Sequence, residues 1–260
     1  MLEVSAVDVR TLEDPALFDT WYRQMPPQRA KSIDRYKQGL NQRQSLGAGI
    51  LLHEALLAHG LSDRDIEIGP FGKPYLKDQP LHFNLSHSAH LAVCILSDQP
   101  SGIDIQQVRA FKPALIKRVF LPEEMEGVSR FAQKNAPLDA ACTLLWSAKE
   151  SVMKCLGYGF RLSPLSIRIS ADFRKASIDS ADSADWIASN DSSGLNGLMD
   201  TNDSNASAKP ETNKSETNRN LHLHTELVTD SSGETYALAL CVETRGESAC
   251  PAPDISWLNL

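Results

Sequence analysis

The sequence predicts an α+β fold in two halves, each of which combines a long helix with several short strands. Two segments, 41–60 and 138–157, have the apolar spacing of amphipathic helices. Short strand-like runs bounded by Gly and Pro lie close to each of them in the chain. With 260 residues and 42% hydrophobic content, the chain can form one large domain or two small ones that share a core.

The first long helix is expected over 41–60, which reads "NQRQSLGAGILLHEALLAHG". Gly60 closes this segment, as glycine commonly does just beyond the end of a helix. Its spacing predicts one buried face. The apolar residues at roughly helical intervals are Leu46, Ile50, Leu51 and Leu57.

Strands are expected after this helix. The segment 65–76, "DIEIGPFGKPYL", is short, alternating and broken by Gly and Pro, so it predicts a strand and a turn. Three further strands are expected in "LHFNL", "LAVCILS" and "GIDIQ". The first of these is expected to stop at about Leu85, ahead of the polar residues "SHS".

The second long helix is expected over 138–157, "LDAACTLLWSAKESVMKCLG", with Gly157 as its stop. Trp146, Glu150 and Lys154 form a separate row along this helix. The residues that can share its apolar face are Leu145, Ala148, Val152 and Leu156.

A second small sheet is expected from "LSIRISA", "LHLHTELV" and "TYALALCVE". His222 and His224 lie on one face of the middle strand, and we expect them to point to solvent. Between the first two strands, 19 of the 33 residues in 188–220 are Ser, Asn, Asp or Thr. Such a segment holds too little apolar surface for a core, so a disordered surface insertion is expected.

Charge and composition narrow the class of function. A net charge of -7 argues against general nucleic-acid binding. No apolar run reaches the roughly 18 residues that span a bilayer, and no signal segment is apparent, so we expect a cytoplasmic protein. The five cysteines form no C-x-x-C pair and are expected to be reduced. One basic patch stands near the start: Arg29, Lys31, Arg35, Lys37 and Arg43.

Several polar residues are suited to a phosphorylated ligand and a divalent cation. Asp104 and Glu150 offer the hard oxygen atoms that magnesium prefers, and Ser86 and His87 offer side-chain donors. Each also has an ordinary interpretation, because Glu150 with Lys154 is a common i,i+4 helical pair. Positive charge is available from Lys31, Arg43, Lys73 and Lys154.

Taken in chain order, the motifs "GKPYL", "FNLSHS", "SGIDIQ", "VFLPEE" and "WSAKESVMKCLGYGF" resemble those of the 4'-phosphopantetheinyl transferases. The resemblance is to the large two-lobed type that activates surfactin synthetase. It spans roughly 29–165 and does not cover the Ser/Asn-rich insertion. It implies two similar, pseudo-twofold-related lobes, expected at 1–104 and 105–260, with coenzyme A and Mg2+ bound between them.

The same resemblance implies roles for individual residues. Asp104 and Glu150 would bind Mg2+, and Glu150 would also accept the proton of an attacking serine hydroxyl. Lys154 would stabilise or protonate the leaving phosphate. Contacts with coenzyme A are implied for Lys31, Arg43, Ser86 and His87 at its phosphates and for Lys73 and Pro74 beside its nucleotide.

One residue departs from the pattern of this type. The position two after Asp104 is commonly Glu, whereas this chain has Gln106. Residues 104 and 106 project to the same side of a strand, so the Gln106 amide can reach the cation or a water bound to it. It brings no negative charge.

The implied partner is an apo acyl or peptidyl carrier protein of fatty-acid, polyketide or nonribosomal peptide synthesis, and the two-lobed type implies a monomer. Carrier proteins are typically acidic, so local positive charge is needed on an enzyme of net charge -7. A coenzyme A-binding protein without transfer activity is the alternative, supported by Gln106 alone. Besides the N-terminal basic patch, the candidates for carrier contacts are Lys112, Lys117 and Arg118.

Overall fold

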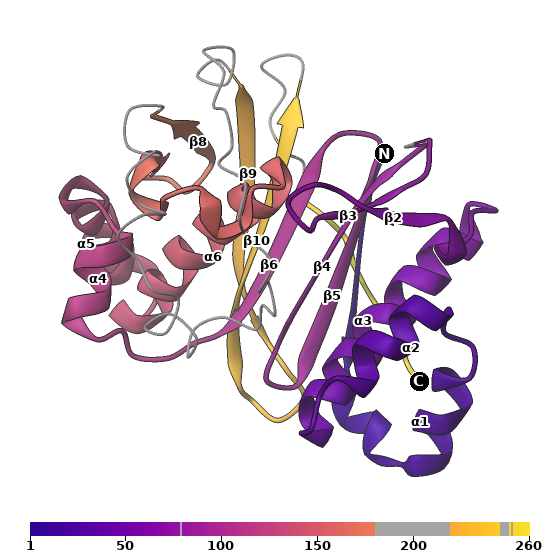
Figure 1. Ribbon diagram of the computed structural model, residues 1–260. Coiled ribbons are helices and arrows are strands. Elements are labelled where there is room, and N and C mark those ends of the chain that lie inside the picture. The colour runs from indigo at the N-terminus through magenta and orange to yellow at the C-terminus, as the bar shows by residue number, and fades with distance from the viewer. Residues whose placement is uncertain (79, 180–218, 245–249, 251) are drawn as a thin grey trace.

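Two sheets lie face to face in the middle of the molecule, and helices cover the outer face of each (Figure 1). The computed structural model describes residues 1–78, 80–179, 219–244, 250 and 252–260. The helices are α1 Pro15–Tyr22, α2 Pro27–Asp34, α3 Gly39–Ala58, α4 Pro113–Val119, α5 Pro122–Asn135 and α6 Leu138–Leu156. Short 3-10 helices are η1 Val9–Glu13, η2 Asp63–Asp65, η3 Gly159–Arg161 and η4 Pro164–Ser166.

The strands form two larger sheets and a hairpin. The first sheet has the order β11 Ile255–Trp257, β1 Leu2–Asp8, β5 Leu91–Ser97 and β4 His82–Ser88. The second has the order β6 Ser101–Gln107, β10 Thr235–Thr244, β9 Asn220–Thr229, β8 Lys175–Ile178 and β7 Ile167–Ile169. β2 Ile66–Ile68 pairs with β3 Pro74–Leu76. The α+β class predicted from the sequence is therefore confirmed.

Strand β5 shows how the layers share their cores. Its side chains alternate between two clusters, because successive residues of a strand point to opposite faces. Ala92, Cys94 and Leu96 pack with α3, whereas Leu91, Val93 and Ile95 pack against β6 and β10 of the second sheet. Each face of β5 is thus buried, and the two sheets are joined by a common apolar layer.

Helix α3 matches the predicted segment with one correction. Leu46, Ile50 and Leu51 are buried as expected, but Leu57 is 60% exposed. Leu57 lies in the last turn of α3, where Leu56 is buried instead. Helical spacing fixes which residues share a face but not how far along the helix the packing extends, so the prediction for Leu57 was wrong.

Helix α6 packs closely on the second sheet, and its predicted apolar face is confirmed. Leu145, Ala148 and Val152 are buried, and Leu156 packs beside them. Gly157 ends the helix in the left-handed region at φ 78°, a conformation that glycine adopts without strain. The predicted stop is therefore confirmed.

Gly102 on β6 allows α6 to approach the sheet. A Cβ atom at Gly102 would lie 2.2 Å from the Ser151 carbonyl oxygen and 2.4 Å from the Cys155 nitrogen. Both are backbone atoms of α6, so no side-chain rearrangement could make room. The glycine therefore fixes where the helix crosses β6.

Strands β4 and β6, from different sheets, lie side by side through a seam of side-chain to backbone hydrogen bonds. Alternate residues of β4 accept from alternate amides of β6: Asn84 from Ile103 at 3.0 Å, Ser86 from Ile105 at 3.3 Å and Ser88 from Gln107 at 3.0 Å. The strand thus continues to Ser88, and the expectation that it stops at Leu85 was wrong. Side-chain oxygens of β4 thus accept the hydrogen bonds of β6 amides in place of a backbone ladder between the two sheets.

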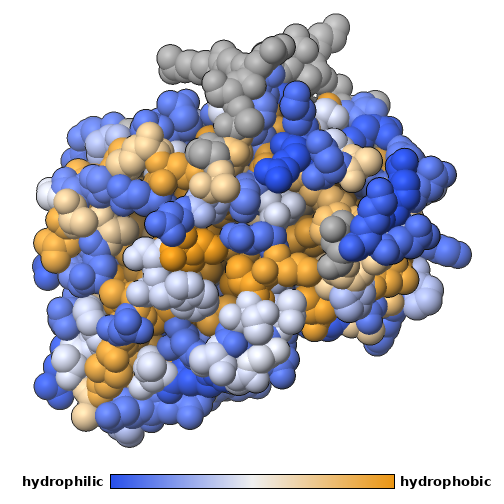
Figure 2. Space-filling model, turned by 180° about the vertical axis from the view of Figure 1, so that it is seen from behind, coloured by the Kyte–Doolittle hydropathy of each residue, from blue (hydrophilic) through white to orange (hydrophobic). Residues whose placement is uncertain are grey.

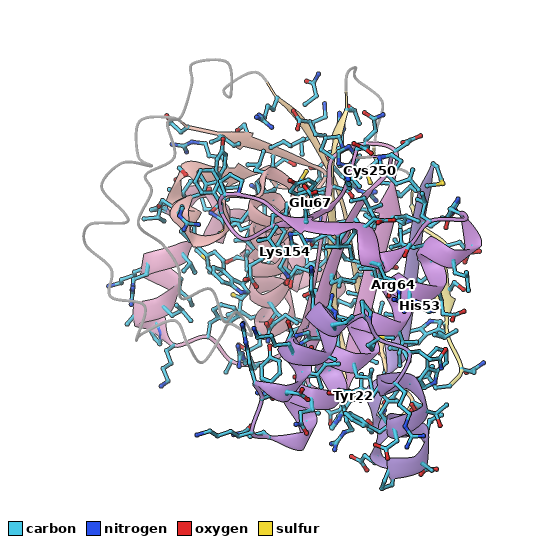
Figure 3. The ribbon with its side chains drawn as sticks, turned by 45° about the vertical axis from the view of Figure 1, so that its right-hand side comes forward. Tyr22, His53, Arg64, Glu67, Lys154 and Cys250 are labelled. Atoms are coloured by element: carbon cyan, nitrogen blue, oxygen red, sulfur yellow. The ribbon has the colours of Figure 1, made fainter. Side chains whose placement is uncertain are left out.

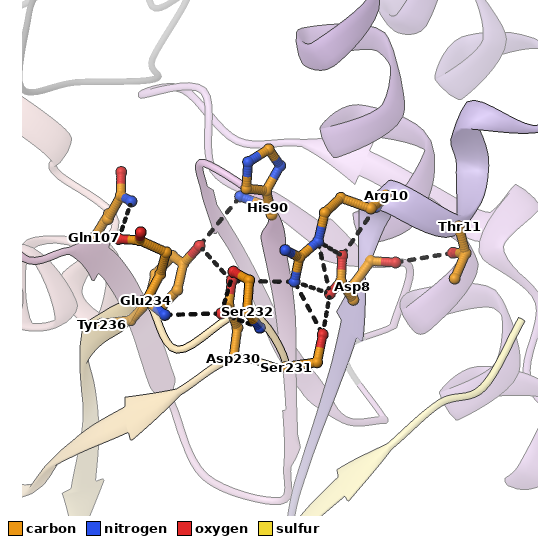
Figure 4. A network of polar contacts seen from close by, with 10 residues as sticks. All are labelled: Asp8, Arg10, Thr11, His90, Gln107, Asp230, Ser231, Ser232, Glu234 and Tyr236. Atoms are coloured by element: carbon orange, nitrogen blue, oxygen red, sulfur yellow. Dashed lines mark hydrogen bonds and ion pairs between the residues drawn. The ribbon is translucent and has the colours of Figure 1, made fainter.

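A polar network ties the turn between β9 and β10 to the start of the chain (Figure 4). Asp230 accepts from Arg10 and from the Tyr236 hydroxyl, both at 3.2 Å. Arg10 also pairs with Asp8 at the end of β1. The Tyr236 oxygen in turn accepts from the His90 amide at 3.4 Å, just after β4. The network therefore anchors the turn that follows Ser88.

The division of the chain into lobes at residue 104 stays a prediction. Residue 104 lies inside β6, which pairs with β10, and β11 near the C-terminus pairs in parallel with β1. Residues 188–218 of the expected insertion lie outside the described part of the chain. Asn220 is the first residue of β9.

The histidines of β9 differ from expectation. His222 and His224 are both buried, so the prediction that they point to solvent was wrong. Burial lowers the pKa of His224, and its Nε2 lies 3.6 Å from Glu226 Oε1. His222 and His224 alternate with Leu221 and Leu223, which pack in the core with α6, so the histidines lie on the opposite face of the sheet. Local sequence does not reveal that this second face is buried too.

Hydrophilic residues cover much of the face in Figure 2, with hydrophobic residues gathered across its middle. None of the helices in the described part of the chain has the length and apolar character needed to span a membrane. In the described part of the chain, the exposed large hydrophobic side chains come from five separate segments. They are Met1, Leu57, Ile68, Leu138 and Trp257.

Candidate functional site

The crossing of α6 over β6 brings acidic and basic side chains together. Glu150 and Lys154 stand one turn apart on α6, and Asp104 follows Gly102 by two residues on β6. Lys154 Nζ lies 2.6 Å from Asp104 Oδ1, across the two elements. Figure 3 shows Lys154 near the middle of the molecule, whereas Tyr22 and His53 lie on the helices of the N-terminal half.

Ser86 of β4 completes this cluster. Its hydroxyl donates to Asp104 Oδ1 at 3.0 Å and accepts from Lys154 Nζ at 2.9 Å. It also accepts from the Ile105 amide in the seam. A serine hydroxyl has one donor and two acceptor positions, so these three bonds use its full capacity. Ser86 is thereby fixed between β6 and α6.

Glu150 lies buried beside Asp104. Burial raises the pKa of Glu150 well above its usual value, and the neighbouring Asp104 carboxylate raises it further. The Lys154 ammonium and a hydrogen bond with Trp146 act in the opposite direction. A carboxyl group whose pKa is raised in this way is a stronger base than an ordinary glutamate and is suited to accept a proton.

A cavity of about 200 Å³ opens beside this cluster. Helices α2 and α3 close one side of it, and β4, β6 and α6 form the other. The lining residues are Arg29, Ser32, Tyr36, Ser45, Ala48, Leu85, Ser86, His87, Asp104, Ile105, Gln106, Glu150 and Lys154. Among these lining residues, Arg29 is the charged residue on the α2 side, whereas Asp104, Glu150 and Lys154 lie on the other side.

The acidic end of this cavity has the composition of a divalent-cation site. Asp104 Oδ2 is buried and has no hydrogen-bond partner among the described residues, and the Glu150 carboxyl lies beside it. Within the described ranges, no cluster of three or more His, Cys, Asp or Glu residues could hold a metal. The third oxygen donor available here is the Gln106 amide, which fits a hard cation such as Mg2+.

Six of the residues predicted from the sequence line this one cavity: Ser86, His87, Asp104, Gln106, Glu150 and Lys154. The other four predicted residues, Lys31, Arg43, Lys73 and Pro74, are not part of the cavity lining. Lys31 is exposed in the last turn of α2, and Arg43 pairs with Glu13 at 3.0 Å. Pro74 begins β3. The ligand contacts assigned to these four stay predictions.

Lys73 binds the end of helix α6. Its Nζ donates to the Cys155 carbonyl at 2.9 Å and to the Ser101 carbonyl at 3.2 Å. Burial lowers the pKa of this ammonium. A cation at the last carbonyls of a helix also interacts favourably with the helix dipole, so Lys73 holds the hairpin β2–β3 against α6.

Sequence reasoning missed several residues of the site. Arg29 was assigned only to the basic patch, yet it lines the cavity together with Tyr36 and Ser45. Burial lowers the pKa of Arg29. The spacing of Ser86 and Ser88 two residues apart could have revealed that both face β6, had the strand been extended beyond Leu85.

Comparison with known proteins identifies the family to which the chain belongs. A sequence profile of the 4'-phosphopantetheinyl transferase superfamily matches residues 100–241, which include Asp104, Glu150 and Lys154. The chain belongs to this superfamily.

Curated relatives agree with this assignment. The chain is 33% identical over 132 residues to a 4'-phosphopantetheinyl transferase of Bacillus subtilis, covering 49% of this chain and 58% of the relative. It is 33% identical over 114 residues to the transferase Sfp of B. subtilis strain 168, covering 43% and 50%. Its identity to the transferase gsp of Aneurinibacillus migulanus is 26% over 162 residues, covering 61% and 67%. The matched parts thus span about half of the first two relatives.

Proposed function

We propose that this protein transfers the 4'-phosphopantetheine arm of coenzyme A to a serine hydroxyl of an apo acyl or peptidyl carrier protein. The second product would be adenosine 3',5'-bisphosphate. The observation that carries this proposal is the meeting of Asp104, Glu150 and Lys154 at one cavity, beside Ser86 and His87. Family membership gives this cluster its reaction class.

The residues of the cluster divide the chemistry. Glu150 takes the proton of the carrier serine as the serine oxygen forms a bond to the β-phosphorus of coenzyme A. The bond between that phosphorus and the bridging oxygen breaks, and its electron pair leaves with the α-phosphate. Lys154 neutralises the charge on this leaving phosphate or gives it a proton.

Residues around the cluster hold the substrate and the cation. Asp104, Gln106 and Glu150 would hold Mg2+, which when bound supplies charge neutralisation on the pyrophosphate. His87 and Arg29 place positive or donor groups at the cavity wall, where phosphate oxygens would lie. We retain the proposed contacts of Lys31, Arg43, Lys73 and Pro74 with the rest of coenzyme A.

Other aspects of the proposal follow from the resemblance. We propose two pseudo-twofold-related lobes, a monomeric state and a cytoplasmic location. Exposed Lys112 directly precedes helix α4, and exposed Lys117 and half-buried Arg118 lie in its last turn. Together they offer positive charge to an acidic carrier.

The direct test incubates the protein with coenzyme A, Mg2+ and an apo carrier protein and then weighs the carrier by mass spectrometry. We expect the carrier to gain the mass of one phosphopantetheine group. A carrier whose target serine is replaced by alanine serves as the control and should gain nothing. Binding of coenzyme A without any gain of mass would instead favour the coenzyme A-binding protein without transfer activity.

A further inference from the structure

Two equivalent rungs connect β4 to β6 at the site. In the first rung, Ser86 accepts from the Ile105 amide and contacts the side chain of Asp104. In the second rung, Ser88 accepts from the Gln107 amide at 3.0 Å and contacts the side chain of Gln106. Each serine thus binds the side chain at one position of β6 and the backbone amide of the next.

The rungs differ in the direction of the side-chain bond. Ser86 donates its proton to a carboxylate, since Asp104 Oδ1 can only accept. Ser88 instead accepts from Gln106 Nε2 at 3.3 Å. The nitrogen end of the Gln106 amide is therefore the end that faces Ser88.

This direction has a consequence for the cavity. Gln106 lines the cavity, whereas Ser88 is buried in the wall behind it. With its nitrogen bound to Ser88, Gln106 has its oxygen Oε1 directed away from Ser88, in the cavity lining that also holds Asp104 and Glu150. An amide oxygen is a neutral ligand for a hard cation, whereas an amide NH2 group would repel it.

We propose that Ser88 is a positioning residue that orients the Gln106 amide, so that Oε1 serves as a neutral oxygen ligand of the divalent cation. This inference rests on the proposed function, because it places the cation at Asp104 and Glu150. It explains how the site accommodates Gln where relatives of this type commonly have Glu. Ser88 acts through Gln106 and does not touch the substrate.

The test measures Mn2+ binding to the full chain by electron paramagnetic resonance of the free ion, in the presence of saturating coenzyme A. We expect Ser88→Ala to weaken Mn2+ binding about 10-fold, at the low end of the range for partners of metal ligands. Gln106→Ala should weaken it to a similar extent. Because Ser88 acts only through Gln106, the double variant should be no weaker than Gln106→Ala alone.

Asn84→Ala is the matched control. It removes the equivalent seam acceptor, that of the Ile103 amide, away from the cavity. We expect it to lower thermal stability about as much as Ser88→Ala does while leaving Mn2+ affinity unchanged. If Ser88→Ala failed to fold, the Gln106→Ala protein would still test whether the amide binds the ion.

The outcomes separate this inference from the function on which it rests. Asp104→Ala should weaken Mn2+ binding more than either change in the second rung, and normal Mn2+ binding in that variant would overturn the cation site itself. Weak binding by Asp104→Ala with normal binding by Gln106→Ala would overturn only the role of Gln106. A loss in Ser88→Ala that added fully to that of Gln106→Ala would overturn positioning by Ser88.

Discussion

Lys154 and Asp104 form an ion pair of 2.6 Å that occupies only one of the two carboxylate oxygens. Oδ1 also accepts from Ser86, whereas Oδ2 is buried with no hydrogen-bond partner among the described residues. The carboxylate thus has one oxygen directed to the lysine and one available to a cation. Lys154 and a divalent cation must therefore share Asp104 and repel each other.

This competition predicts opposite effects of Lys154→Met on binding and on turnover. Removing the ammonium should tighten Mn2+ binding several-fold, because a positive charge beside the ligand is lost. Carrier modification should slow by about 10²-fold or more, as is typical when a positioned acid–base group is removed. Both are measured on one preparation, by spin resonance and by mass spectrometry. Lys117→Met, which changes an exposed lysine of α4, is the control and should leave Mn2+ affinity unchanged. Weaker Mn2+ binding in Lys154→Met would contradict competition between Lys154 and the cation for Asp104.

Glu150→Gln should separate chemistry from binding of coenzyme A. The variant keeps the size of the side chain but removes the proposed base and one anionic ligand, so transfer should fall by about 10² to 10⁴-fold. Coenzyme A binding, measured by calorimetry, should be largely retained. Lys73→Ala should instead weaken the binding of coenzyme A. Near wild-type turnover in Glu150→Gln would remove both roles assigned to this residue.

The positions of the two long helices could be predicted from the sequence because periodicity and glycine stops are local signals. Gly157 adopts the left-handed conformation that its position after α6 implied. The polar end of β4 was missed for a physical reason. Asn and Ser favour turns, since their side chains compete for backbone hydrogen bonds, but here they bond to the backbone of β6.

The remaining differences between prediction and structure involve residues whose contacts are with distant parts of the chain. Lys73 lies 82 residues from Cys155 in the chain, so nothing near Lys73 indicates that it binds the end of α6. The site residues Asp104 and Glu150 were found because their motifs resemble those of a family, whereas Arg29 has no motif of its own. Only the fold brings Arg29 to the same cavity.

Gly102→Ala should disturb both stability and activity. The added methyl group would lie 2.2 Å from a backbone oxygen of α6, so the helix must move away from β6. We expect a loss of at least about 1–3 kcal/mol in unfolding free energy, as for overpacked cores. Transfer should also fall, since Glu150 and Lys154 move relative to Asp104. Gly127→Ala in α5 is the matched control, because its nearest neighbour would lie 3.5 Å away, and urea denaturation compares the two. Equal stabilities would show that α6 has room over β6.

The network around Asp230 predicts how stability depends on pH. Burial alone would raise the pKa of Asp230, but hydrogen bonds from Ser232 and the Glu234 amide, together with the charge of Arg10, lower it below its usual value of 3.8. A carboxyl group with a lowered pKa in the folded state contributes stability above its unfolded pKa. That contribution is lost as the pH falls below about 4.

Asp230→Asn should therefore destabilise the protein at pH 7 by about 1–3 kcal/mol, the range for a buried charge-assisted hydrogen bond. The difference from the wild type should shrink as the pH falls below about 4, because the wild type then loses the same charge. Urea denaturation from pH 7 to pH 3 measures both. Thr11→Val removes a hydroxyl bond to the backbone carbonyl of Asp8 and involves no carboxylate, so it should shift stability equally at every pH. A pH-independent difference for Asp230→Asn would mean that the carboxylate charge does not hold the β9–β10 turn to Arg10.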